Sequence, residues 1–92
     1  MEAYIVNGYR TAVTKAKRGG FNYTSPLDFG AAVINYLIDN TPGFDPGLVE
    51  DLIVGNAVPE AEQGLQMARW VSMRSNLPME IPGVTVNRYC GS

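Results

Sequence analysis

An apolar run in the middle of the chain constrains the fold most. Residues 52–55 read Leu-Ile-Val-Gly, with no alternation between apolar and polar positions. Such a run is typical of a parallel strand covered on both faces, because a strand with one solvated face shows a period of two. Parallel strands need long crossover connections, which helices usually supply. The run therefore predicts an α/β fold in which helices cover a mostly parallel sheet.

Two further segments are predicted to be strands, and two are predicted to be helices. Residues 3–6 are apolar on both faces, and residues 84–88 are rich in β-branched side chains. Helical spacing of apolar residues follows the first of these strands, and residues 62–76 form a second helical segment that is apolar over most of its surface. A helix of that kind is largely buried or lies at an interface. The order strand, helix, strand, helix, strand indicates a layered α/β fold with a mixed, mostly parallel sheet.

The first helix has clear end signals. Ser25 is suited to cap its first turn, and Pro26 is suited to the first helical position. The helix is expected to end near Asn40, because a proline and a glycine follow closely. Gly30 inside it indicates close approach to another element. Residues 45–50 predict a short helical turn before the central strand.

Charge and cysteine content exclude several classes of function. Seven Lys and Arg face nine Asp and Glu, a net charge of -2 that argues against a nucleic-acid binder. One cysteine and no histidine exclude an internal disulfide and a Cys/His zinc site within these residues. No segment looks like a secretory signal or is apolar for long enough to span a membrane. We therefore expect a cytoplasmic protein without a metal, a nucleic-acid partner or a membrane span.

Cys90 is the residue that carries candidate chemistry. It lies just past the last predicted strand and before Gly91 and Ser92. One interpretation is a small buried hydrophobic residue, which is the usual role of a lone cysteine. The other is a nucleophile presented at the carboxyl end of a strand, where ligands bind to open α/β sheets and a following helix N-terminus would stabilise a thiolate. Position alone leaves both interpretations open.

Residues 86–92, Val-Asn-Arg-Tyr-Cys-Gly-Ser, resemble the nucleophile motif of thiolases, the acetyl-CoA acetyltransferases and 3-ketoacyl-CoA thiolases. Other segments resemble that family in the same order along the chain: residues 2–6, 10–13, 27–31, 54–58 and 64–69. Together they cover essentially the whole chain. Val13 and Thr14 depart from the pattern of many members, which concerns the shape of a loop. Residues 60–64 look more like the degradative, fatty-acid-oxidising branch.

The resemblance implies a thiolase-type layered fold, with residues 1–92 as an incomplete amino-terminal part of the N-terminal domain. It implies an acyltransferase in which Cys90 accepts the acyl group and its backbone N–H serves an oxyanion hole. Coenzyme A and acyl-CoA would be substrates, with no permanently bound cofactor and no assigned cofactor-binding residue. The family also needs a histidine and a second cysteine. The rest of the polypeptide would supply them, so residues 1–92 alone are expected to be inactive.

The family typically forms homodimers or homotetramers. Two alternatives are a ketoacyl-synthase-type condensing enzyme and a non-catalytic relative that binds CoA or lipid. The basic residues 15–18 are interpreted as a solvated turn, with contact to CoA phosphates as the alternative. Arg69 and Arg74 are interpreted as ion-paired structural residues. Asn87 and Arg88 are expected to make structural hydrogen bonds or subunit contacts, because a strand alternates its faces and at most one of them points toward Cys90.

Overall fold

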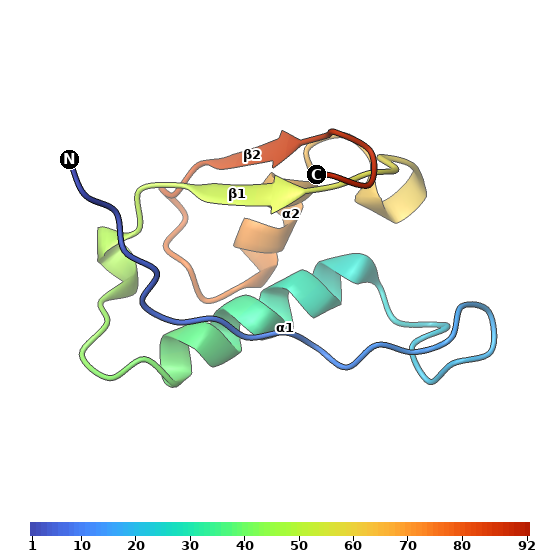
Figure 1. Cartoon of the computed structure of the whole chain (residues 1–92), viewed down its shortest axis with the longest axis horizontal. Helices are drawn as coiled ribbons and strands as arrows, with labels where there is room; N and C mark the ends of the chain where they lie inside the picture. The colour runs from blue at the N-terminus through green and yellow to red at the C-terminus, as the bar shows by residue number, and fades with distance from the viewer.

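Two short parallel strands form the sheet of the computed structural model, which describes all 92 residues (Figure 1). β1 (Leu52–Gly55) pairs with β2 (Gly83–Val86), residue for residue. The connection between them contains the 3₁₀ turn η2 (Ala61–Gln63) and the helix α2 (Met67–Arg74). The predicted α/β fold, with parallel strands joined through a helix, is therefore confirmed.

The first helix forms where its end signals predict. α1 (Pro26–Asp39) is capped by Ser25, whose Oγ accepts a hydrogen bond of 3.3 Å from the backbone N–H of Leu27. Asn40 is the residue that ends the helix. A 3₁₀ turn, η1 (Pro46–Leu48), lies within the predicted helical turn that leads into β1. Neither α1 nor α2 combines the length and the apolar character that a membrane-spanning helix requires.

Helix α2 lies at the centre of the packing. It contacts both strands on one side and α1 on the other (Figure 1). The buried apolar side chains come from α2 and its neighbours: Ala31, Met67, Ala68, Val71 and Ile81. A Cβ atom added at Gly30 would lie 2.9 Å from Cγ1 of Val71, so the close approach predicted at this glycine is made to α2.

The prediction that residues 52–55 are covered on both faces is wrong for the structure described. Exposure alternates along both strands, and 65% of the surface of Ile53 is exposed. Val84 and Val86 are also exposed, at 39% and 38%. Both helices lie on the same side of the sheet (Figure 1). The exposed side chains of Ile53, Val84 and Val86 alternate with those that face the helices, so they lie on the opposite face.

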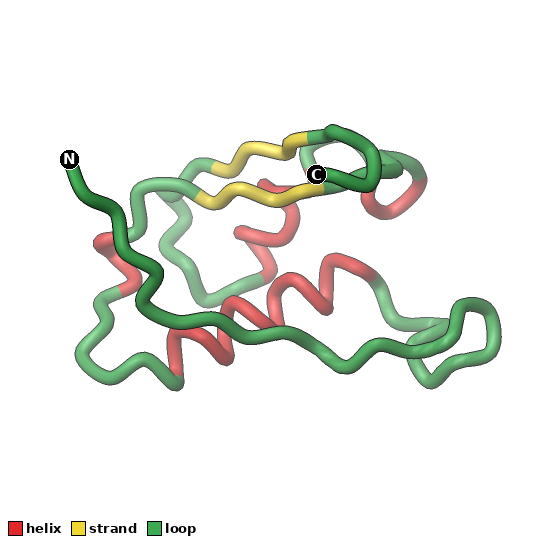
Figure 2. Tube along the Cα trace, viewed as in Figure 1, coloured by secondary structure: helices red, strands yellow, loops and turns green.

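The predicted first strand, residues 3–6, does not form. Residues 1–14 take part in no backbone–backbone hydrogen bond. The segment runs as an extended loop beside α1 and away from the sheet (Figure 2). There Asn7 Nδ2 donates to Thr41 Oγ1 at 3.1 Å. A helix uses its own backbone groups internally and offers no ladder of donors and acceptors, so an apolar segment beside it gains contacts but no strand pairing.

The second helix and the last strand are shorter than predicted. The predicted helix 62–76 is realised as Met67–Arg74, because Leu65 within the predicted range has a φ of 55°, which a right-handed helix cannot include. Leu65 consequently lies outside the helix and is exposed. The predicted strand 84–88 ends at Val86, because the next residue begins a turn closed by its own side chain.

Candidate functional site

Cys90 lies in a tight turn just beyond the carboxyl end of β2. The backbone N–H of Gly91 donates to the carbonyl of Arg88 at 3.0 Å, and that of Ser92 donates to the carbonyl of Tyr89 at 3.2 Å. Cys90 is therefore a central residue of two overlapping turns, residues 88–91 and 89–92. Cys90 is exposed, and its backbone N–H makes no hydrogen bond within the chain. The alternative that Cys90 is a small buried hydrophobic residue does not fit this placement.

The side chains of Asn87 and Ser92 close the turn from both ends. Asn87 Oδ1 accepts a hydrogen bond of 2.7 Å from the backbone N–H of Tyr89. Ser92 Oγ accepts one from the backbone N–H of Arg88 and donates one to the carbonyl of Tyr89, both at 2.7 Å. Structural hydrogen bonding, one of the roles expected for Asn87, is confirmed. The side chain of Arg88 makes no hydrogen bond or ion pair.

The end of β1 supports this turn from the side. The backbone N–H of Asn56 donates to the carbonyl of Val86 at 3.0 Å, which extends the parallel pairing by one residue. Gly55 lies against Ser92, and a Cβ atom at Gly55 would collide with the carbonyl oxygen of Ser92. The two strand ends and the turn around Cys90 therefore form one edge of the sheet, near the C-terminus in Figure 1.

A buried polar residue at the same edge was missed in the sequence analysis. Asn56 is only 5% exposed, and its Nδ2 donates to the carbonyl of Gln63 at 2.6 Å. Its Oδ1 accepts a 3.3 Å hydrogen bond from the backbone N–H of Val58. The side chain thereby ties the loop after β1 to the strand end. A polar side chain directly after the apolar run 52–55, at the end of a predicted strand, was the signal that could have identified it.

The basic residues considered earlier lie elsewhere. Arg74 forms an ion pair of 3.3 Å with Asp28, as expected, with both side chains about half exposed. Arg69 forms no ion pair, so that part of the prediction is wrong; its guanidinium donates to the carbonyls of Met79 and Ile81 at 3.0 and 2.9 Å. Backbone carbonyl groups of the adjacent loop, and no carboxylate, accept the hydrogen bonds of this guanidinium. The basic segment 15–18 leads into a series of turns that precedes α1.

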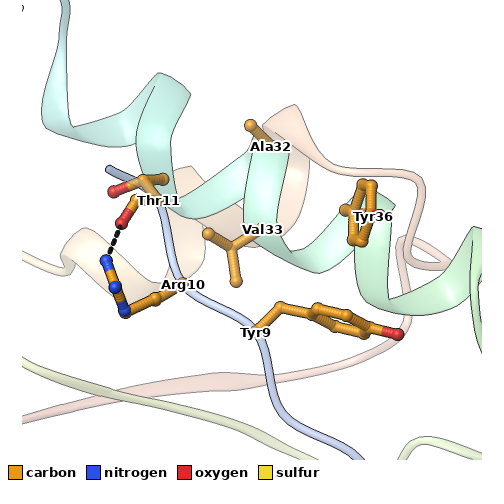
Figure 3. A pocket seen from close by; sticks show the side chains of 6 residues that line it. All are labelled: Tyr9, Arg10, Thr11, Ala32, Val33 and Tyr36. Carbon is orange, nitrogen blue, oxygen red and sulfur yellow. Dashed lines mark hydrogen bonds between the residues drawn. The ribbon is translucent and has the colours of Figure 1, made fainter.

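The hollows on the molecule lie away from Cys90. One of about 330 Å³ separates the N-terminal segment from α1 (Figure 3). Tyr9 and Tyr36 meet edge to face there, with ring centroids 4.8 Å apart, and the Arg10 guanidinium bonds the carbonyl of Thr11. No residue from 87 to 92 lines this hollow or any of the other three. Cys90 therefore lies at an open edge of these residues.

Comparison with known proteins relates the chain to one family. The family model "Thiolase, N-terminal domain" matches residues 3–92. The chain is 47% identical to the 3-ketoacyl-CoA thiolase of Bacillus subtilis (strain 168) over 91 residues, which are 99% of this chain and 23% of that protein. It is 38% identical to the enzyme of that name from Aliivibrio salmonicida, with 96% and 23% covered.

A plant protein extends the range of these relatives. The chain is 39% identical to "3-ketoacyl-CoA thiolase 5, peroxisomal" of Arabidopsis thaliana, with 96% of the chain and 19% of that protein covered. The chain thus spans about a quarter or less of the length of these relatives. Because the family model covers nearly every residue, the chain belongs to the thiolase family, in the region of its N-terminal domain.

Proposed function

We propose that the protein containing this chain is a 3-ketoacyl-CoA thiolase, an acyltransferase whose acyl-accepting nucleophile is Cys90. The observation that carries the proposal is the exposed Cys90 in a tight turn beyond β2, in a chain nearly half identical to a protein of that name. Substrates would be coenzyme A and its thioesters. The degradative direction places the enzyme in fatty-acid β-oxidation, and the reverse reaction would condense an acyl-CoA with acetyl-CoA.

The proposed reaction has two steps through a covalent intermediate. First, the thiol of Cys90 gives its proton to a base, Sγ bonds to the 3-keto carbon of the substrate, and the bond between C2 and C3 breaks. The electron pair goes to C2, which takes a proton and leaves as acetyl-CoA. In the second step the thiol of free CoA attacks the acyl-cysteine. The bond from sulfur to the acyl carbon breaks, a shortened acyl-CoA leaves, and Cys90 regains its proton.

Two features of the turn support this role. The N–H of Cys90 is unpaired within the chain, which suits a donor to the oxyanion that forms as a carbonyl is attacked. The thiol is exposed, so a substrate can reach it. A base is needed to activate the thiol, and an acid is needed to protonate C2. Residues 1–92 contain no histidine and no second cysteine, so both groups would come from other parts of the polypeptide.

The proposal extends to the setting of the enzyme. We place it in the cytoplasm as a homodimer or homotetramer with no permanently bound cofactor. Support comes from the unpaired cysteine, which suits a reducing compartment, and from relatives in bacteria.

The test uses the full-length protein with acetoacetyl-CoA and CoA. Wild-type protein should cleave acetoacetyl-CoA, and acid quenching before CoA is added should trap an acetyl group on Cys90, detected by peptide mass spectrometry. Cys90→Ala should abolish both signals, while Ser72→Ala, a substitution in the core, should retain them. Acetoacetyl-CoA should also slow alkylation of Cys90 by iodoacetamide.

Different results would select other functions. Thiolysis by Cys90→Ala, or equal alkylation with and without substrate, would contradict the role of Cys90. Decarboxylation of a malonyl thioester in place of thiolysis would indicate a ketoacyl-synthase-type enzyme. Binding of acyl-CoA without turnover would indicate a non-catalytic relative.

A further inference from the structure

Tyr89, the residue before Cys90, has a backbone conformation that side-chain packing does not explain. Its φ is 50°, in the left-handed region that residues with a Cβ atom seldom adopt. The side chain is 80% exposed, so burial does not hold it there. Some other interaction must compensate for the unfavourable conformation. Because φ at this position sets the direction in which the chain enters Cys90, that interaction also sets where the sulfur lies.

Both backbone polar groups of Tyr89 are bonded by side chains of the turn. Its N–H donates to Asn87 Oδ1, and its carbonyl accepts from Ser92 Oγ, each at 2.7 Å. The same hydroxyl accepts the N–H of Arg88 at 2.7 Å, so its one proton and a lone pair are both used. We call this pair of side chains the Asn87–Ser92 clasp. It spans Cys90 and leaves the cysteine N–H unpaired.

A second contact fixes the clasp relative to the sheet. Gly55, the last residue of β1, lies so close to Ser92 that any side chain on it would collide with the carbonyl of Ser92. The next residue, Asn56, bonds to the carbonyl of Val86 and anchors the adjacent end of β2. The turn is thus closed by its own side chains and held against the neighbouring strand.

We infer that Asn87, Ser92 and Gly55 are positioning residues for Cys90 in the acyl-transfer reaction. The inference rests on the proposed function, because it assigns roles around the nucleophile named there. The clasp holds Tyr89 in the left-handed conformation, Gly55 provides the space for Ser92, and the result is an exposed thiol with an unpaired N–H beside it. None of the three touches the reacting carbon; they act through the backbone on either side of Cys90.

The experiment compares disruptive and conservative substitutions in the full-length protein. Asn87→Ala and Ser92→Ala each remove a side-chain hydrogen bond to Tyr89. Asn87→Ala should lower kcat for thiolysis of acetoacetyl-CoA by about five- to tenfold, the usual effect of one hydrogen bond. Ser92→Ala should lower it at least as much, because it also removes the hydrogen bond from the backbone N–H of Arg88. KM should stay within about twofold, because a misplaced nucleophile affects a step after binding. Asn87→Ser and Ser92→Thr keep an oxygen at each position and should recover most of kcat.

Gly55→Ala tests the contact between Gly55 and Ser92 and should lower kcat at least as much as the alanine variants of the clasp. Gly20→Ala is its control, because a Cβ at Gly20 meets no atom within 4 Å. Thermal unfolding of every variant identifies any that do not fold, and the serine and threonine variants then decide. If Asn87→Ser and Ser92→Thr lose as much kcat as the folded alanine variants, the inference is overturned. Where an alanine variant does not fold, a loss of kcat of about five- to tenfold in the serine or threonine variant overturns it. It is also overturned if folded alanine variants keep kcat within twofold of the wild type.

Cys90→Ala separates this inference from the proposed function. Thiolysis by Cys90→Ala would overturn the proposed function itself. Loss of thiolysis by Cys90→Ala, together with full activity of the clasp variants, would overturn only the positioning roles.

Discussion

Gly30→Ala is the substitution whose effect the packing of the two helices decides most directly. In an open helix, replacing an interior glycine by alanine stabilises by about 1 kcal/mol. Here the added methyl group would lie 2.9 and 3.0 Å from the two Cγ atoms of Val71, tighter than ordinary contact. Val71 is 1% exposed and has little room to move. Overpacking of this kind costs about 1–3 kcal/mol. The net expectation is a destabilisation of up to about 2 kcal/mol.

A second substitution should reverse the sign of the effect of Gly30→Ala on stability. Val71→Ala removes both methyl groups that would collide with the new side chain. In that background, Gly30→Ala should stabilise by about 1 kcal/mol, the intrinsic helix preference alone. The two changes are therefore predicted to be strongly non-additive, as expected for side chains in contact.

The assay is urea unfolding of the full-length protein, supported by hydrogen exchange measured on peptides that cover α1 and α2. Gly30→Ala should lower protection in both helices, and Gly20→Ala should leave it unchanged. Gly30→Ala raising stability equally with and without Val71 would refute the close contact between α1 and α2.

Three further predictions follow from single residues. Ser72→Ala should raise the free energy of unfolding by about 0.5–1 kcal/mol, because the buried hydroxyl has no hydrogen-bond partner; a lower urea midpoint would show that it has one. Arg69→Ala should lower stability by about 1–3 kcal/mol, and Arg69→Lys should recover part of it, because the guanidinium bonds two carbonyls, those of Met79 and Ile81; an unchanged midpoint would contradict this. Tyr89→Val should reduce kcat for thiolysis several-fold and Tyr89→Asn should not, because asparagine tolerates a positive φ and valine does not. Equal kcat values for the two variants would refute the claim that the positive φ at this position matters for thiolysis.

Local signals predicted the elements well where they were strong. The cap at Ser25 and the breakers after Asn40 located α1, and the unalternating run located β1. The start of α2 was missed because Leu65 gives no warning of a positive φ, which glycine or asparagine would have given. Residues 3–6 have strand character, but a strand exists only beside a partner, and partner choice is a tertiary property.

The site was predictable in part for a similar reason. The place of Cys90 at a strand end follows from the sequence order, since β2 precedes it directly. The Asn87–Ser92 clasp depends on a contact across a turn between side chains five positions apart. Neither the helical nor the strand periodicity of a sequence predicts such a contact. The contact between Gly55 and Ser92 depends on strand register, because β1 and β2 are far apart in the sequence.

The register that joins Leu52 to Gly83 also has a consequence during synthesis. β1 leaves the ribosome well before β2, and residues 56–82 must follow before its partner exists. At roughly 5–20 residues per second, translation leaves β1 unpaired for on the order of seconds, with Ile53 and its neighbours exposed. Folding of this region is thus a delayed event in the nascent chain. Slower translation through residues 56–82 should lengthen the interval in which chaperones or other nascent chains can bind that strand.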